Sequence, residues 1–109
     1  RLLLDRGAVI NAHRKDGRTP LHAAAGGTYM NIATLLLDRG ADVRARDNEG
    51  FAPLHMAVMN SQKGMIQLLL ARGSDVNAKD NRGRTPLALA KSKRLEDVAA
   101  YLASRGARE

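Results

Sequence analysis

The chain has 109 residues, with 18 Lys and Arg against 11 Asp and Glu, which gives a formal net charge of +7. Cysteine is absent, which excludes disulfide bonds, thiol catalysis and cysteine-ligated zinc within this sequence. No apolar run approaches the roughly 18 residues of a membrane-spanning helix, and no signal-peptide pattern opens the chain. The charge favours acidic partners by electrostatic steering, with solubility as the competing explanation. An intracellular location, cytoplasmic or nuclear, is expected.

The dominant feature of the sequence is a repeat with a period of 33 residues. A period of roughly 20 to 50 residues is typical of stacked supersecondary units, each of which covers the apolar face of its neighbour. Glycine, proline, leucine and alanine recur at equivalent positions, which are Gly17, Gly50 and Gly83; Pro20, Pro53 and Pro86; Leu21, Leu54 and Leu87; Ala24, Ala57 and Ala90; and Gly7, Gly40, Gly73 and Gly106.

Residues 19–25 read Thr-Pro-Leu-His-Ala-Ala-Ala, and residues 35–43 read Leu-Leu-Leu-Asp-Arg-Gly-Ala-Asp-Val. Together they resemble an ankyrin repeat, and the resemblance covers nearly the whole chain. It implies a mostly α-helical solenoid of stacked helix-turn-helix units joined by β-turn fingers, which usually serves as a protein-binding surface. We expect one domain, made of a partial repeat at 1–13, repeats at 14–46 and 47–79, and a C-terminal capping repeat at 80–109.

The chain opens on residues that match only the end of a second helix, so we expect a fragment of a longer array. Gly7 is expected to end that helix in a left-handed conformation, which glycine adopts without a Cβ penalty. A finger then follows, and the glycine of its turn, Gly17, tolerates positive φ. The same finger is expected at 40–50 and at 73–83.

The first helix of each repeat is expected to begin at a proline, because proline at the first helical position loses no hydrogen bond that it needs. Thr19 and Thr85 precede two of these prolines and can act as N-caps. Ala52 takes this place in the middle repeat, which predicts a local weakness there. The expected first helices are Pro20–Gly26, Pro53–Met59 and Pro86–Ser92.

Many ankyrin repeats have a glycine after the first helix, where this chain has Thr28, Ser61 and Arg94. Gly27 and Asn60 are therefore the candidates for the left-handed turn. Arginines at the ends of the second helices complement the helix dipole, and we interpret them as structural; they are Arg6, Arg39, Arg72 and Arg105. The expected second helices are Met30–Asp38, Gly64–Ala71 and Leu95–Ser104.

No catalytic or metal site is predicted, and no cofactor is expected. His22 and His55 occupy equivalent repeat positions, and the resemblance implies that they hydrogen-bond between loops and caps. A metal site would need further ligands that converge on them, and no such cluster is apparent in the sequence. No phosphate-cradling glycine motif with its lysine occurs either. We therefore expect an interaction module and not an enzyme.

Ankyrin repeats typically bind through the finger tips and the exposed edge of the first helices. Our hypothesis is an apolar centre of Phe51 and Met59 with a basic rim, which is the layout of many binding hot spots. The competing expectation is that Phe51 folds back over its own finger. The candidate partner-binding residues are Lys15, Arg18, Arg46, Glu49, Phe51, Met59, Asn60, Lys79, Arg82, Arg84 and Lys93.

Two other functions stay open at this point. Basic fingers could bind a nucleic acid or another polyanion with a steep salt dependence, although Tyr29, Phe51 and Tyr101 are too few aromatics for interleaved base stacking. The chain could also be a scaffold or regulatory segment of a larger enzyme or channel.

Overall fold

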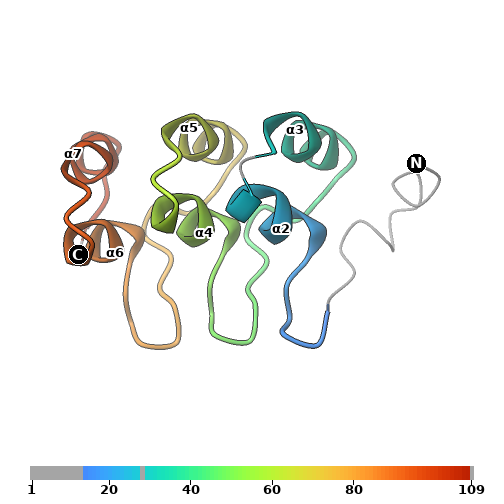
Figure 1. Cartoon of the computed structure of the whole chain (residues 1–109), viewed down its shortest axis with the longest axis horizontal. Helices are drawn as coiled ribbons and strands as arrows, with labels where there is room; N and C mark the ends of the chain where they lie inside the picture. Colours follow the sequence, from blue (N-terminus) through green and yellow to red (C-terminus); the bar gives the residue numbers. More distant parts are fainter. Residues whose placement is uncertain (1–13, 28, 109) are drawn as a thin grey trace.

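The computed structural model describes residues 14–27 and 29–108. Six helices in this part of the chain stand in two rows, with the fingers projecting from one side (Figure 1). The first row holds α2 (Pro20–Gly27), α4 (Pro53–Met59) and α6 (Pro86–Ser92). The second row holds α3 (Met30–Asp38), α5 (Lys63–Ala71) and α7 (Glu96–Ser104).

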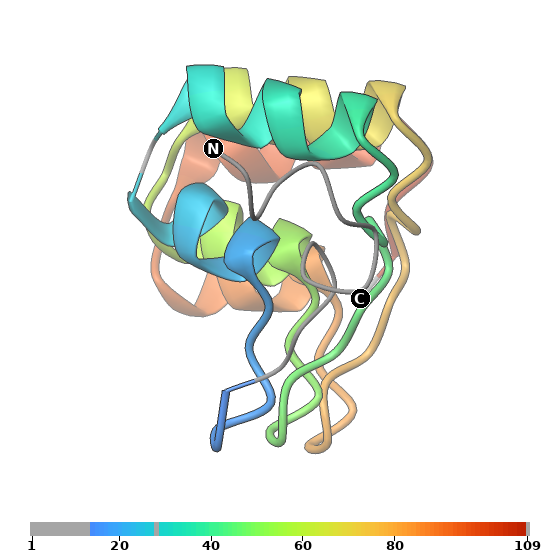
Figure 2. The same cartoon turned by 90° about the vertical axis from the view of Figure 1, so that its right-hand side faces the viewer.

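Each repeat contributes one helix to each row, and the repeats follow one another along the slab. The α2 helix packs against α4, and α4 packs against α6, while α3 lies against α5. Seen along the stack, the fingers line up and project in one direction (Figure 2). This arrangement confirms the predicted solenoid of helix-turn-helix units joined by turn fingers.

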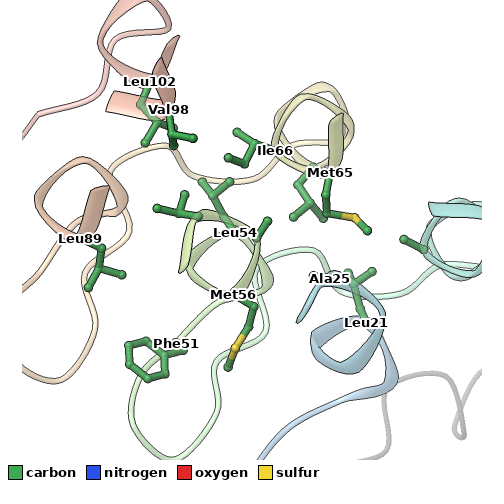
Figure 3. Close-up of a cluster of buried hydrophobic side chains, with 14 of the residues drawn as sticks. Leu21, Ala25, Phe51, Leu54, Met56, Met65, Ile66, Leu89, Val98 and Leu102 are labelled. Carbon is green, nitrogen blue, oxygen red and sulfur yellow. The ribbon is translucent and has the colours of Figure 1, made fainter. Parts of the chain in front are cut away.

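The core lies between the two rows and runs the length of the stack (Figure 3). Leu54, Ala57 and Val58 of α4 are buried, as are Ile66 and Leu69 of α5. The small alanine side chains let helices approach closely, and larger apolar side chains fill the space between the rows. All of α4 from its first proline to Val58 is buried because it has helices on both sides and α5 above it.

The predicted helix bounds agree closely with the structure. The bounds of α3, α4 and α6 are as expected, α2 ends one residue later, and α5 and α7 differ by one residue at their starts. Glycines that end the second helices or form the finger turns have positive φ, as the turn chemistry requires. They are Gly17, Gly40, Gly50, Gly73, Gly83 and Gly106, at φ values from 77° to 103°.

The expectation for the turn after the first helix is wrong. Asn60 has φ −98°, and the left-handed residue is the next one, Ser61, at φ 55°. Arg94 takes the same conformation at φ 58° in the last repeat. The position in the fold therefore sets the backbone geometry even where the residue carries a Cβ. The partial repeat at 1–13 lies outside the described residues, as does Thr28.

Candidate functional site

An aspartate organises each of the second and third finger tips. The Asp47 carboxylate oxygen Oδ1 accepts hydrogen bonds from the backbone N–H groups of Glu49 at 2.9 Å and Phe51 at 2.8 Å. Asp80 repeats this arrangement one repeat later, with the N–H groups of Arg82 and Arg84, each at 2.9 Å. A short side chain that accepts from the following backbone is how aspartate stabilises a turn.

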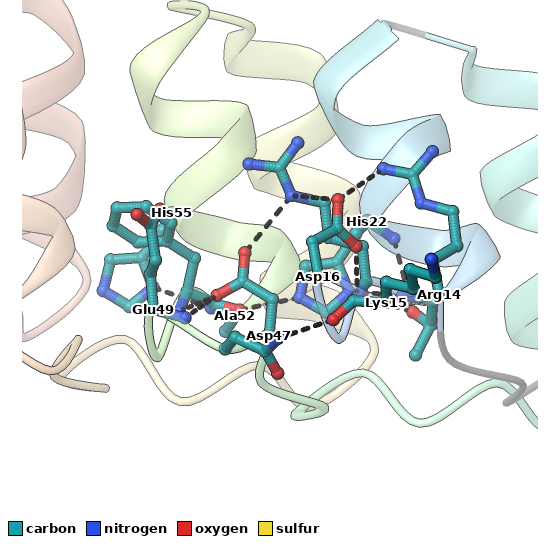
Figure 4. A network of polar contacts seen from close by, with 12 residues as sticks. Arg14, Lys15, Asp16, His22, Asp47, Glu49, Ala52 and His55 are labelled. Atoms are coloured by element: carbon teal, nitrogen blue, oxygen red, sulfur yellow. Dashed lines mark hydrogen bonds and ion pairs between the residues drawn. The ribbon is translucent and has the colours of Figure 1, made fainter.

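Asparagines tie each finger tip to the one before it. The Asn48 backbone N–H donates to the Asp16 carbonyl at 2.8 Å, and its side-chain amide donates to the Lys15 carbonyl at 2.7 Å. Asn81 makes the equivalent bonds to the Glu49 carbonyl at 3.0 Å and the Asn48 carbonyl at 2.8 Å. Part of this network is shown in Figure 4. The tips therefore form a connected row, which holds their exposed side chains at fixed spacing.

A depression of about 250 Å³ lies between the second and third finger tips. At its floor, the Phe51 ring lies 5.7 Å from the His55 ring, and the Arg84 guanidinium carbon lies 5.9 Å from the Phe51 ring centre. Both contacts are within the range of favourable ring and cation–π interactions. We call this depression the tip groove, and its lining residues are Asn48, Glu49, Phe51, Asn81, Arg82 and Arg84.

The charges in the tip groove are held in different ways. Arg84 Nε lies 2.8 Å from Asp80 Oδ2, and the Asp80 side chain is almost fully buried. Burial raises the pKa of Asp80, but the backbone N–H groups of Arg84 and Arg82 and the Arg84 guanidinium together lower the pKa below its ordinary value. Arg82 and Glu49 are exposed and form no ion pair among the described residues. They are therefore available to a partner.

The predicted binding residues fall into separate groups. Glu49, Phe51, Arg82 and Arg84 meet in the tip groove. Lys15 and Arg18 belong to the first finger, where Arg18 Nε lies 3.2 Å from Asp47 Oδ2. Arg46 and Lys79 line a different pocket, between the finger limbs that leave α3 and α5. The remaining residues lie at the opposite end of the first helices, and they are Met59, Asn60 and Lys93.

Phe51 does not form the exposed apolar centre that the hypothesis required. Its side chain is only 8% exposed and belongs to the core cluster. It points toward α4 because His55 on that helix and Arg84 on the next finger flank its ring. The competing expectation, that Phe51 covers its own finger, agrees with this burial. Met59 is half-buried and lies at the C-terminal end of α4, so it is not part of the same depression.

The two equivalent histidines connect neighbouring repeats, as the resemblance implied. His22 Nδ1 accepts from the Thr19 N–H at 3.1 Å, and His22 Nε2 contacts the Phe51 carbonyl at 2.7 Å. His55 Nδ1 accepts from the Ala52 N–H at 3.0 Å, and its Nε2 contacts the Arg84 carbonyl. The Phe51 and Arg84 carbonyls occupy equivalent positions, each directly after the tip glycine of a finger. A backbone N–H can only donate, so Nδ1 is unprotonated and Nε2 carries the proton.

Burial lowers the pKa of His55, which outweighs the opposing effects of the Arg84 carbonyl and the Asp80 carboxylate. The neutral imidazole is the form that fits these hydrogen bonds, because a proton on Nδ1 would face the Ala52 N–H. The two histidines therefore have a structural role, which is to link neighbouring repeats. In the described ranges, no group of three or more His, Asp or Glu side chains could hold a metal ion.

Sequence reasoning missed two kinds of residue near the site. Asp47 and Asp80 shape the tips, and the signal was their identical place three residues before the tip glycine. Arg44 lines the pocket beside Arg46 and Lys79. The sequence feature that could have identified Arg44 is its difference from the equivalent residue of the next repeat, Asn77.

Comparison with known protein families identifies a family that covers most of the chain. A model described as ankyrin repeats in three copies matches residues 1–80 of this chain. A search of curated proteins found no matching relative. Within residues 14–27 and 29–108, none of the helices has the length and apolar character needed to cross a membrane.

Proposed function

This chain belongs to the ankyrin-repeat family, and on that premise we propose that it binds an acidic segment of a partner protein through the tip groove. Ankyrin repeats are, in general, protein–protein interaction modules. The specific proposal is that Arg82 and Arg84 contact the acidic segment and that Glu49 limits which sequences fit. The edge of the first helices, where Met59, Asn60 and Lys93 lie, extends the contact surface.

The tip groove is the observation that carries this proposal. It is formed by two repeats together, and the asparagine ties keep its walls at a fixed separation. A preformed site loses less conformational entropy on binding than one that must be ordered first. Arg82 is exposed at its wall, whereas Arg84 is already oriented by Asp80. One arginine is thus free to adapt to a partner and the other presents a fixed face.

The net charge of +7 supports an acidic partner, because complementary charge raises the association rate and disfavours basic competitors. Nucleic acid is the weaker candidate. Phe51 is buried, while Tyr29 precedes α3 and Tyr101 lies in α7, so neither tyrosine stands among the finger cations. Base stacking between basic side chains is the common basis of single-strand binding. A scaffold or regulatory role within a larger enzyme or channel would use the same surface.

The test begins with affinity capture on the immobilised 109-residue chain at two salt concentrations, followed by identification of the retained proteins. Binding of a purified partner is then measured for Arg82→Gln by calorimetry. We expect Arg82→Gln to weaken binding about tenfold, which corresponds to about 1.4 kcal/mol. Higher salt should weaken the wild type more than the variant, because the lost charge carries part of the attraction.

The matched control is Lys63→Gln, which removes one positive charge from the exposed start of α5, in the other helix row. It should bind as the wild type does. Arg82 is a better test position than Phe51, since replacing a buried ring would also perturb the core. Equal weakening by both glutamine variants would show that overall charge, and not the tip groove, is responsible.

A further inference from the structure

A second pocket, of about 350 Å³, lies between the finger limbs that leave α3 and α5. We call it the limb pocket. It shares no lining residue with the tip groove. Its apolar part is formed by Ala52 and Ala78, and its polar lining residues are Arg44, Arg46, Asp75, Asn77 and Lys79. Three of these five carry positive charge and one carries negative charge, so the pocket has an excess of two positive charges.

Arg44 forms the hydrogen bond that an asparagine forms in the next repeat, and its guanidinium has further N–H donors. In the next repeat, the equivalent Asn77 donates its side-chain amide to the Gly106 carbonyl at 3.3 Å. Arg44 Nε donates to the equivalent Gly73 carbonyl at 2.9 Å. The tie between repeats is thus kept, but a guanidinium has four further N–H groups. No hydrogen bond or ion pair of those groups forms with another described residue, so they remain available at the rim of the pocket.

Arg46 and Lys79 place two more cations at the same pocket, from equivalent positions of neighbouring repeats. Arg46 Nε donates to the Gly50 carbonyl at 3.2 Å, and its terminal nitrogen donates to the Lys79 carbonyl. These two bonds hold the guanidinium between the tip of the second finger and the limb that leaves α5. The Lys79 ammonium is exposed and forms no ion pair within the described part of the chain. Lys79 can therefore reach toward whatever anion occupies the pocket.

The negative charge in the pocket comes from Asp75, and one of its carboxylate oxygens already accepts a hydrogen bond from the backbone. Its Oδ1 atom accepts a hydrogen bond from the Asn77 backbone N–H at 2.9 Å. No ion pair between Asp75 and the three cations is formed. The cations are thus not neutralised by the one carboxylate beside them. Like charges held together without a counter-ion favour a bound anion.

We propose that the limb pocket binds a phosphate monoester, as presented by a phosphorylated serine or threonine of a partner protein. A phosphate monoester carries a charge of about −1.5 to −2 at pH 7, which matches the excess of two positive charges. Its three oxygens can accept from two guanidinium groups and one ammonium at once, and arginine geometry suits phosphate. A carboxylate has one charge and two oxygens, so it matches the pocket less well.

A phosphorylated protein segment is a better occupant than a nucleic acid. A polynucleotide presents a phosphate at every nucleotide and needs a continuous basic track. Here Asp42 and Asp75 stand on the same limbs as the cations and interrupt such a track. A single phosphate on an otherwise neutral segment avoids this repulsion.

The proposal is tested by NMR titration of the whole chain with a short neutral peptide that contains one phosphoserine. The same peptide without phosphate and inorganic phosphate alone are the other two probes. The phosphopeptide should shift the amide signals of Ala78 and Lys79 in a saturable way, and the unphosphorylated peptide should not. Saturation by inorganic phosphate with none by the phosphopeptide would contradict the proposal, since it would describe a site for the free ion.

The decisive variant is Arg44→Asn, which installs the residue found at the equivalent place of the next repeat and so keeps the tie to the Gly73 carbonyl. Its thermal stability should match the wild type, while the Kd for the phosphopeptide should rise at least about fivefold. Arg82→Gln removes the same charge from the tip groove and should leave that Kd unchanged. Equal loss in the two variants, or no loss in Arg44→Asn, would overturn the proposal. Tip-groove binding does not depend on this result.

Discussion

The middle and last repeats start their first helices with the same backbone but with different side-chain hydrogen bonds. Ala52 before α4 and Thr85 before α6 both have φ −85°, with ψ 165° and 166°. Ala52 has no side-chain acceptor, and only His55 Nδ1 bonds to the Ala52 N–H, at 3.0 Å. In the last repeat, Thr85 Oγ1 accepts from the Ala88 N–H at 3.2 Å and donates to the Arg108 carbonyl at 2.6 Å.

This difference shows that the stack, and not the individual cap, determines where each helix begins. The threonine side chain forms its hydrogen bonds within its own repeat. The histidine ring also contacts the next repeat, where its Nε2 atom meets the carbonyl of the residue after the tip glycine. The last repeat has Ala88 at the histidine position, and there the threonine hydroxyl takes over a contact to a later segment. Packing on both sides lets the middle repeat keep its helix without a side-chain acceptor at the cap position.

The largest expected effect comes from removing a side chain between the helix rows. Leu69 in α5 has no exposed surface, so Leu69→Ala should lower the free energy of unfolding by about 2–5 kcal/mol. Its neighbour Leu70 is only half-buried, and the last repeat already has Ala103 at that position. Leu70→Ala is therefore the control and should cost much less. Urea denaturation compares the two, and equal losses would contradict the importance of the two-sided packing.

The fold could be predicted from the sequence because the repeat sets its own register. Proline at each first helical position and glycine at each positive-φ position leave little freedom in where helices begin and end. The turn after the first helix was harder to predict. Ser61 and Arg94 take a left-handed conformation that their own side chains disfavour. The bonds that close the helix ends hold it, with the Gln62 N–H on the Ala57 carbonyl at 3.0 Å and the Leu95 N–H on the Ala90 carbonyl at 2.9 Å.

The next largest effect should be a gain in stability from Ala52→Thr. The backbone at this position matches that of the threonine before α6, and Thr85 and Thr19 are themselves buried there, so the side chain fits. The new hydroxyl should accept from the His55 N–H, as Thr19 accepts from the His22 N–H. We expect the free energy of unfolding to rise by about 0.5–2 kcal/mol.

The control for this prediction is Thr85→Ala, which makes the last repeat resemble the middle one at the same position. It should lower the melting temperature, because it removes both the cap and the bond to the Arg108 carbonyl. A melting temperature of Ala52→Thr at or below that of the wild type would show that His55 alone saturates the start of α4.

The candidate site was only partly predictable from the sequence. Equivalent positions located the fingers, and four of the predicted residues do meet in the tip groove. The sequence could not show that Phe51 points inward, because that depends on the His55 ring and the Arg84 guanidinium on either side of it. Nor could the sequence show that Arg46 and Lys79 line a separate pocket, since this depends on how the limbs of neighbouring fingers lie against each other.

A smaller gain is expected when glycine replaces the left-handed residues after the first helices. Ser61→Gly and Arg94→Gly should each stabilise the chain by about 0.5–1 kcal/mol, because a Cβ in this conformation costs about 1–2 kcal/mol and glycine returns part of that in chain entropy. The reverse change, Gly106→Ala at φ 92°, is the control and should destabilise. Thermal melts measure all three, and a loss on introducing glycine at Ser61 would show that its side chain is needed there.

The smallest expected effect is a dependence on pH that the middle repeat has and the last repeat lacks. Burial lowers the pKa of His55 below its ordinary value of 6.5, so the folded state favours the neutral ring. Its contribution is complete above pH 6.5 and is lost as pH falls through the folded pKa, because the unfolded state then binds the proton more readily. The charged groups that act on the ring are Asp80 and Arg46, and the Arg84 carbonyl contacts its Nε2.

The variant that isolates this effect is His55→Gln, since glutamine at this helix position can accept from the preceding cap N–H without titrating. Urea denaturation of both proteins between pH 7.5 and 5 should show the wild type losing more stability than the variant. The carboxyls of Asp80 and Asp16 have lowered pKa values, so their contributions are lost only as pH falls through values below 3.8, and this range excludes them. A constant difference between the two proteins would mean that the ring takes up protons to the same extent in the folded and unfolded states over this range, which would contradict a lowered pKa of His55 in the folded stack.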